Sequence, residues 1–130
     1  MNKLMILPKF VEYLSSRGLS YTSANDDILN FSYEGLNYMF QSFQETDPYY
    51  FRIMLPKVNN KTVNTDVMRL VNQLNRDYKA VKIVEMEQGS IWMVLESFVY
   101  NIDGVDLLFA RMIDVLRIVI NEYRRKENEL

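Results

Sequence analysis

The spacing of apolar residues changes along this chain and divides its first half into one helical and several extended segments. Residues 3–17 carry apolar side chains at every third or fourth position, which predicts an amphipathic helix. Gly18 follows, and a glycine at this place commonly ends a helix in the left-handed conformation. Residues 27–33 and 36–43 are instead rich in β-branched and aromatic side chains, and Glu34-Gly35 between them predicts a tight hairpin turn.

A third strand and a short helix are predicted after this hairpin. Residues 49–55 form a further apolar run, which ends where Pro56 lacks a backbone donor. The three strands therefore form an antiparallel meander. After a polar stretch, Asn64 or Thr65 is expected to cap a helix. The apolar face of this helix consists of Val67, Leu70, Val71, Leu74 and Tyr78.

The second half of the chain predicts another hairpin and the longest helix. Val81–Glu87 and Ser90–Tyr100 flank Gln88-Gly89, again a tight turn that contains glycine. The second of these strands has largely apolar side chains on both faces, which predicts an interior strand or one covered on both sides. Asp103 or a neighbour is expected to cap a helix over residues 105–125, because apolar side chains form a continuous stripe along that segment.

The predicted order of elements is therefore α-β-β-β-α-β-β-α, which defines the α+β class. A length of 130 residues is the usual size of one domain with its own core. No internal repeat, low-complexity tract or Pro/Gly-rich linker divides the sequence. We therefore expect residues 1–130 to form a single domain.

The residue types present argue against most kinds of enzyme. The chain has no His and no Cys, which are the residues most often used for proton transfer, thiol chemistry and transition-metal binding. The sequence also lacks a Gly-rich phosphate loop and a G-x-S-x-G motif. We therefore expect no catalytic residue, no cofactor and no metal site.

Charge and hydropathy reduce the number of partner classes that we expect for this chain. With 15 basic and 17 acidic side chains, the chain has no charge excess that attracts nucleic acid. Its densest basic cluster, Arg124-Arg125-Lys126, ends the last predicted helix, where cations complement the helix dipole. No apolar run approaches the roughly 20 residues of a membrane span, and the N-terminal segment lacks a signal-peptide cleavage site. We expect a protein without membrane contact, and the absence of cysteine favours the cytoplasm.

The order and lengths of these elements resemble the type III secretion chaperone-like fold, which secretion chaperones of the Tir chaperone type share with the YbjN-like family. The resemblance implies a twisted antiparallel five-stranded sheet with helices packed mainly on one face, frequent homodimers and a function in binding proteins. It includes no short motif, so no family site residue is transferred. The features that carry it are the first helix ending at Gly18, the turns at Glu34-Gly35 and Thr46-Asp47-Pro48, the helix from Thr65, the Gln88-Gly89 hairpin and the long C-terminal helix.

Aromatic side chains of the predicted strands supply one candidate binding surface. The two long helices can cover one face of the sheet, whereas the middle helix is too short to shield the other. Tyr38, Phe40, Trp92 and Phe98 are therefore candidates for partial exposure, depending on strand register. An apolar face of that size needs a partner. The alternative is that these residues belong to the core, where strand aromatics are found more often.

The last predicted helix supplies a second candidate surface. Leu107, Ile113 and Ile118 lie outside its main apolar stripe, so its apolar surface is wider than packing on one sheet requires. We expect either the N-terminal helix or a second copy of the chain to cover the excess, and we expect a homodimer.

Glu96 is an acidic residue in the middle of the most apolar predicted strand. Burial of this carboxylate without a partner is costly. A buried ion pair, an exposed polar stripe and a functional carboxylate all remain open for this residue.

The sequence leaves three functional hypotheses. The leading one is a non-catalytic, chaperone-like or YbjN-like regulatory protein that binds another polypeptide on an apolar surface. The alternative is a small-molecule-binding or regulatory domain that uses a pocket on the sheet face. The third is an enzyme with an unrecognised carboxylate site.

Overall fold

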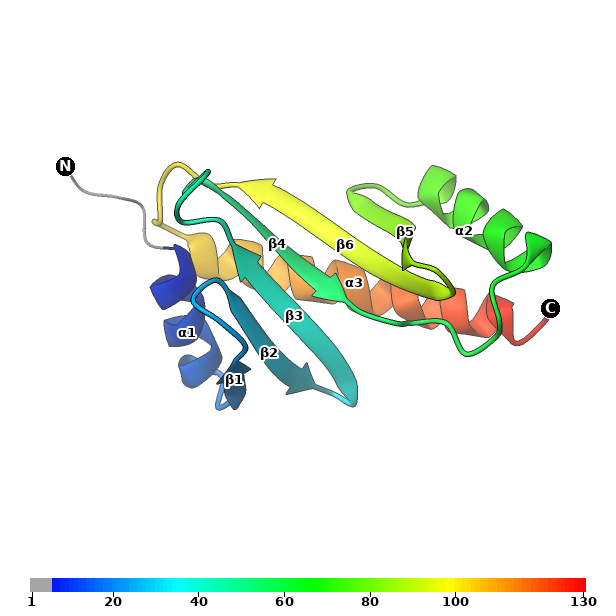
Figure 1. Cartoon of the computed structure of the whole chain (residues 1–130). Coiled ribbons are helices and arrows are strands. Elements are labelled where there is room, and N and C mark those ends of the chain that lie inside the picture. Colours follow the sequence, from blue (N-terminus) through cyan, green and yellow to red (C-terminus); the bar gives the residue numbers. More distant parts are fainter. Residues whose placement is uncertain (1–5) are drawn as a thin grey trace.

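A computed structural model describes residues 6–130, which form an antiparallel sheet with helices behind one of its faces (Figure 1). The α+β class is confirmed, as are two groups of strands separated by a helix. Residues 3–5 of the first expected helix lie outside the described residues. The elements are α1 (Ile6–Ser16), β1 (Tyr21–Ser23), β2 (Ile28–Tyr33), β3 (Leu36–Ser42), β4 (Tyr50–Leu55), α2 (Thr65–Asp77), β5 (Val81–Glu87), β6 (Ser90–Phe98) and α3 (Val105–Glu127).

The described residues form a six-stranded sheet in the order β1-β2-β3-β4-β6-β5, rather than the five-stranded sheet expected. The additional strand, β1, has three residues, all exposed, and pairs with β2 at one edge. A segment this short and polar gives no periodic signal, which is why the sequence did not reveal it. The prediction that β6 is an interior strand is confirmed, since it lies between β4 and β5.

An aromatic core joins α1 and α3 to the middle of the sheet. Phe10 of α1 stacks on Phe40 of β3 with ring centroids 4.2 Å apart. Phe109 of α3 packs edge-on against Phe10 at 4.9 Å and against Phe51 of β4 at 5.5 Å. All four rings are fully buried. Aromatic contacts of this geometry add to the hydrophobic burial, so this cluster fixes how the two helices lie on the sheet.

Three helix ends can be compared with the sequence signals. The side chain of Asn64 accepts a hydrogen bond of 2.9 Å from Val67 N and caps α2, as predicted. Gly18 has a φ of +69° after α1, and the amide of Leu19 donates to Leu14 O, which is the expected left-handed ending. The cap of α3, expected at Asp103 or a neighbour, is the neighbour Gly104, which adopts the left-handed conformation and supplies no side-chain hydrogen bond.

A buried carboxylate ties the end of α3 to the segment that follows β4. Glu127 has no exposed surface, and its Oε1 accepts a hydrogen bond of 3.0 Å from Asn60 N. Its Oε2 accepts from Lys61 N at 3.3 Å and from the hydroxyl of Tyr123 at 2.8 Å. Burial and the neighbouring carboxylate of Glu127 raise the pKa of Tyr123. The contacts satisfy a carboxylate that burial alone would destabilise.

Candidate functional site

The two faces of the sheet have different surroundings. One face, the covered face, packs its side chains into the core with all three helices of the described chain. The opposite face, which we call the open face, carries the alternate side chains of β2 to β6 and looks toward the viewer in Figure 1, with α3 behind the strands. Solvent exposure varies across the open face: Phe98 is 59% exposed, whereas Met54 and Val94 are each 1% exposed.

The centre of the open face is apolar. Met39, Met54 and Val94 stand in one row across β3, β4 and β6. Trp92 lies one step along β6 and pairs in register with Val84 of the edge strand β5. The indole Nε1 of Trp92 donates a hydrogen bond of 3.0 Å to the hydroxyl of Ser90, which satisfies the polar atom of a half-buried ring.

A polar row crosses the same face beside this apolar centre. Gln41, Arg52 and Glu96 stand in register on β3, β4 and β6. The Nε of Arg52 donates to Gln41 Oε1 at 3.0 Å, and its guanidinium lies 5.5 Å from the ring centroid of Phe43. Lys82 Nζ lies 2.8 Å from Glu96 Oε1. The hydrogen bond from Lys82 lowers the pKa of Glu96. Of the three alternatives for Glu96, the structure excludes a buried ion pair, because the Glu96 side chain is 36% exposed.

An aromatic cluster forms the end of the open face where β6 terminates. The ring centroid of Tyr50 lies 5.0 Å from that of Phe43 and 5.5 Å from that of Phe98. Tyr49 and Tyr100 form a further pair at 5.0 Å, next to the cluster along the chain. Phe98 is 59% exposed and Tyr100 is 73% exposed. Contiguous exposed aromatic surface of this kind marks an interaction site more often than isolated apolar residues do.

Two of the four predicted strand aromatics belong to the open face and two do not. Trp92 is half-buried and Phe98 is exposed, and both lie on the open face. Tyr38 and Phe40 are 1% and 0% exposed, because their parity on β3 turns them toward the helices. Tyr38 stacks on Phe31 of β2 with centroids 5.0 Å apart. Tyr38 and Phe40 therefore belong to the core, which was the alternative interpretation of the sequence.

The three candidate residues on the last helix also differ in solvent exposure. Leu107 and Ile118 are 79% and 51% exposed on the side of α3 that faces away from the sheet. Ile113 is 3% exposed and packs into the core, so it forms no surface. The apolar side of α3 that meets the sheet is wider than one stripe, because α1 packs against its N-terminal half. Whether Leu107 and Ile118 contact a partner stays a prediction.

The two edges of the sheet are protected differently. On the outer side of β5, the side chain of Asn75 on α2 donates to Ile83 O at 2.9 Å and accepts from Ile83 N at 2.8 Å. Its amide replaces a neighbouring strand in the middle of that edge. Nothing in the sequence distinguished Asn75 from an ordinary surface residue. At the other edge, residues 6–130 provide no such side-chain bridge to β1.

A large hollow adjoins β1. It has a volume of about 710 Å³ and lies between the segment after α1, the first three strands and Pro56. Its lining contains no charged side chain, and Tyr38 is the single predicted site residue in it. Burial raises the pKa of Tyr38 to about 12. The size is within the range of small-molecule sites.

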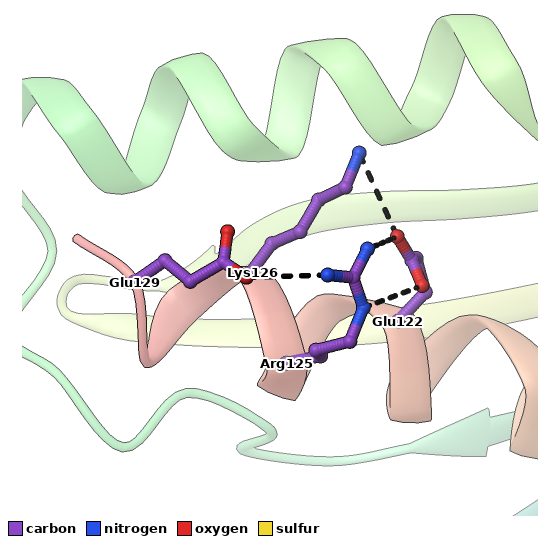
Figure 2. A network of polar contacts seen from close by, with 4 residues as sticks. All are labelled: Glu122, Arg125, Lys126 and Glu129. Carbon is purple, nitrogen blue, oxygen red and sulfur yellow. Dashed lines mark hydrogen bonds and ion pairs between the residues drawn. The ribbon is translucent and has the colours of Figure 1, made fainter.

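Some of the other charged groups in residues 6–130 form local ion pairs. Figure 2 shows the last turns of α3, where Arg125 and Lys126 both contact Glu122 and Arg125 also contacts Glu129. The pKa of Glu122 is lowered, first by its hydrogen bond from Arg125. Over the same residues, no group of three or more potential metal-binding side chains occurs. None of the helices described there is long and apolar enough to cross a membrane.

This arrangement of sheet and helices is the type III secretion chaperone-like and YbjN-like fold. The structure of YbjN from E. coli, a proposed transcription regulator, matches with a TM-score of 0.66 and 12% identity over 93% of each chain. SpcU matches with a TM-score of 0.53 and 18% identity over 85% of this chain and 93% of its own. SpcU was solved in the heterodimeric complex ExoU-SpcU from the type III secretion system of Pseudomonas aeruginosa. At these identities the likeness establishes the fold, which confirms the resemblance seen in the sequence.

No protein-family model and no curated protein matches the chain by sequence.

Proposed function

We propose that this chain is a non-catalytic, chaperone-like or regulatory protein that binds an extended polypeptide segment on its open face. The observation that carries the proposal is the uncovered sheet face with an exposed aromatic cluster around Phe98. SpcU, which shares the fold, was solved in a complex with the polypeptide ExoU, and this supports a function in protein binding.

The chemistry of the open face suits a polypeptide better than a charged small molecule. Tyr50, Phe98 and Trp92 offer large apolar area with few rotatable bonds, and aromatic residues with arginine dominate protein-binding hot spots. The polar row adds the amide of Gln41 and the guanidinium of Arg52, which can hydrogen-bond to a main chain that crosses the strands. An extended segment supplies both apolar side chains and free main-chain groups.

The sole tryptophan of the chain makes this proposal directly testable. Trp92 lies on the open face, so a peptide bound there changes the polarity around its indole. A library of random 20-residue peptides is screened for binding, and the peptides retained are titrated while Trp92 emission is followed. We expect emission to shift to shorter wavelength on binding. Phe98→Ser should weaken affinity by about tenfold or more, as expected for loss of an interface aromatic.

Met68→Ser is the matched control, since Met68 is an exposed apolar residue of α2 that does not belong to the open face. This variant should bind with unchanged affinity. Equal weakening by the two substitutions, or binding that leaves Trp92 emission unchanged, would show that peptides bind elsewhere and would refute the proposed site.

The hollow beside β1 favours a second candidate function, the binding of a small uncharged molecule. Its lining residues Ser32 and Asn37 hydrogen-bond to each other at 2.9 Å and offer polar groups within a mostly apolar wall. A fragment screen by NMR separates the two functions, because a ligand in the hollow shifts the signals of Tyr21 and Ser32, whereas a peptide on the open face shifts those of Trp92 and Phe98.

A further inference from the structure

The outer side of α3 presents a stripe of four exposed residues, Leu107, Arg111, Asp114 and Ile118, which we call the outer stripe. At 100° per residue these positions lie within about 60° of one another around the helix. The buried side chains of α3 occupy its opposite side, against the sheet. Two large apolar side chains therefore point away from the molecule, with one cation and one anion between them.

The outer stripe is symmetric about a point between residues 112 and 113, which lies in the first half of α3. Leu107 lies as far before the midpoint of residues 112–113 as Ile118 lies after it, and both are apolar. Arg111 and Asp114 are symmetric about the same midpoint and carry opposite charges. A two-fold axis through this midpoint would therefore bring apolar residues onto apolar residues and opposite charges together, which is the requirement of an isologous interface.

We propose that the outer stripe is the interface with a second copy of this chain, with the two α3 helices packed antiparallel. Leu107 of each copy packs on Ile118 of the other, and Arg111 of each copy pairs with Asp114 of the other. This proposal does not depend on the binding of a polypeptide to the open face, because the two surfaces lie on opposite sides of the molecule.

Both charges of the outer stripe have atoms left for a further contact. Within residues 6–130, Arg111 has no ion pair, whereas Arg117 and Arg125 of the same helix are both paired. Asp114 receives its hydrogen bond of 3.2 Å from Arg117 on Oδ1, which leaves Oδ2 for a second donor. Complementary charges that meet at an interface fix the register of the two partners.

Two helices flank α3 near its two ends. In Figure 1, α1 lies beside the start of α3 and α2 beside its end, on opposite sides of it. From Leu107 to Ile118 the outer stripe is about 17 Å long, because each residue rises about 1.5 Å. One helix pair of this length is a small interface. The dimer should therefore be weak and depend on protein concentration.

A charge exchange tests the pairing of positions 111 and 114. Arg111→Asp gives a chain with two acidic residues on the outer stripe, and Asp114→Arg gives one with two basic residues. Each variant alone should dimerise about tenfold more weakly or worse than the original chain, since like charges meet. An equimolar mixture should recover dimerisation, because each acidic residue then meets a basic one. Sedimentation equilibrium over a wide concentration range measures all three, and circular dichroism verifies that each variant is folded.

Disulfide trapping tests the antiparallel direction of the two helices. Because the chain has no native cysteine, no other disulfide can form. Leu107→Cys mixed with Ile118→Cys should give a covalent dimer of the two different chains under mild oxidation. Each variant alone should not, since its two sulfurs would lie about 17 Å apart, far beyond disulfide reach.

Three results would overturn the proposal: a strict monomer at high concentration, a disulfide between two copies of Leu107→Cys, or a dimer unaffected by the charge variants and by Ile118→Lys. Peptide binding to the open face is measured separately through Trp92, so the failure of one proposal is distinguishable from the failure of the other.

Discussion

The covered face and the open face are built from alternate residues of the same strands, yet their side chains differ in kind. On β4, Phe51 and Ile53 are fully buried beneath the helices, whereas Arg52 between them is half-buried on the open face. On β6, Met93 is fully buried and its neighbour Trp92 is not. Because hydrophobic burial is the main favourable term in folding, most of the stability resides on the covered face.

The aromatic residues of the two faces should differ in what they contribute: those of the covered face to stability, and those of the open face to the proposed binding. Aromatic residues occur on both faces, but those on the covered face contact one another across helices and strands. On the open face, Phe98 is 59% exposed, and Phe43, Tyr50 and Trp92 are half-buried. Removal of an open-face aromatic should therefore affect binding, and removal of a covered-face aromatic should affect folding.

Phe109→Ala against Phe98→Ala is the strongest test of this separation. Phe109 contacts the rings of Phe10, Phe40 and Phe51, so its truncation leaves a cavity in the core. We expect Phe109→Ala to lower the free energy of unfolding by about 3–5 kcal/mol. Phe98→Ala should lower it by less than about 1 kcal/mol. Urea denaturation measures both values, and similar losses would mean that the open face is part of the folding core.

Glu127→Ala extends the comparison to carboxylates. The substitution removes the acceptor for the amides of Asn60 and Lys61 and leaves the Tyr123 hydroxyl unsatisfied. We expect a loss of about 2–3 kcal/mol in the free energy of unfolding, since buried donors are left without partners. Glu129→Ala, on the same helix end but exposed, is the control and should cost less than about 0.5 kcal/mol. A loss no larger than that of the control would show that the segment after β4 does not depend on this carboxylate.

The alkaline limit of stability should depend on Tyr38 of the covered face. Burial raises its pKa from 10.0 to about 12, so the folded chain holds this proton more tightly than the unfolded chain. The contribution is complete below pH 10 and is lost as the pH rises from 10 toward 12. Tyr38→Phe lacks this loss, and its stability relative to the original chain should rise by about 2 kcal/mol over that interval.

At pH 7 the same variant should be as stable as the original chain or slightly more so. Within residues 6–130 the Tyr38 hydroxyl is buried without a hydrogen-bond partner, so its removal breaks no contact. Thermal melting at pH 8, 10 and 11 follows the difference. Equal losses of stability in both proteins above pH 10 would mean that Tyr38 is not the group responsible.

Periodicity and turn residues were enough to predict the elements, because both are local properties. Helical spacing located α2 and α3, and the glycines at Glu34-Gly35 and Gln88-Gly89 located the two hairpins. The same local signals could not decide which side of β3 faces the helices. Its alternate side chains include Met39 on one side and Tyr38 with Phe40 on the other, and both sets are apolar. Packing against α1 and α3 made that choice.

The contacts that depend on distant segments were also beyond the sequence. Asn75 reaches Ile83 on β5, and Glu127 reaches Asn60 after β4, across 8 and 67 positions. Neither residue belongs to a motif, and polar residues on a helix are ordinarily solvated. The same holds for the candidate surface: the sequence made Trp92 and Phe98 candidates for exposure, whereas the register that puts both on the open face is set by tertiary packing.

The smallest effect is expected from Glu96→Gln, and it distinguishes the open-face carboxylate from Glu127. The hydrogen bond from Lys82 lowers the pKa of Glu96 below its usual 4.5, so its contribution is present above that pH and is lost as the solution becomes more acidic. Since the Glu96 side chain is 36% exposed, screening by water and salt reduces that contribution. Glu96→Gln should cost less than about 0.5 kcal/mol at pH 7 and less still at pH 3, because the contribution of a carboxylate with a lowered pKa decreases as the solution becomes more acidic. Urea denaturation at the two pH values, in low salt, measures the difference. A loss above about 2 kcal/mol at pH 7 would instead make the polar row a structural element comparable to the Glu127 contacts, and the division between a folding face and a binding face would fail at this position.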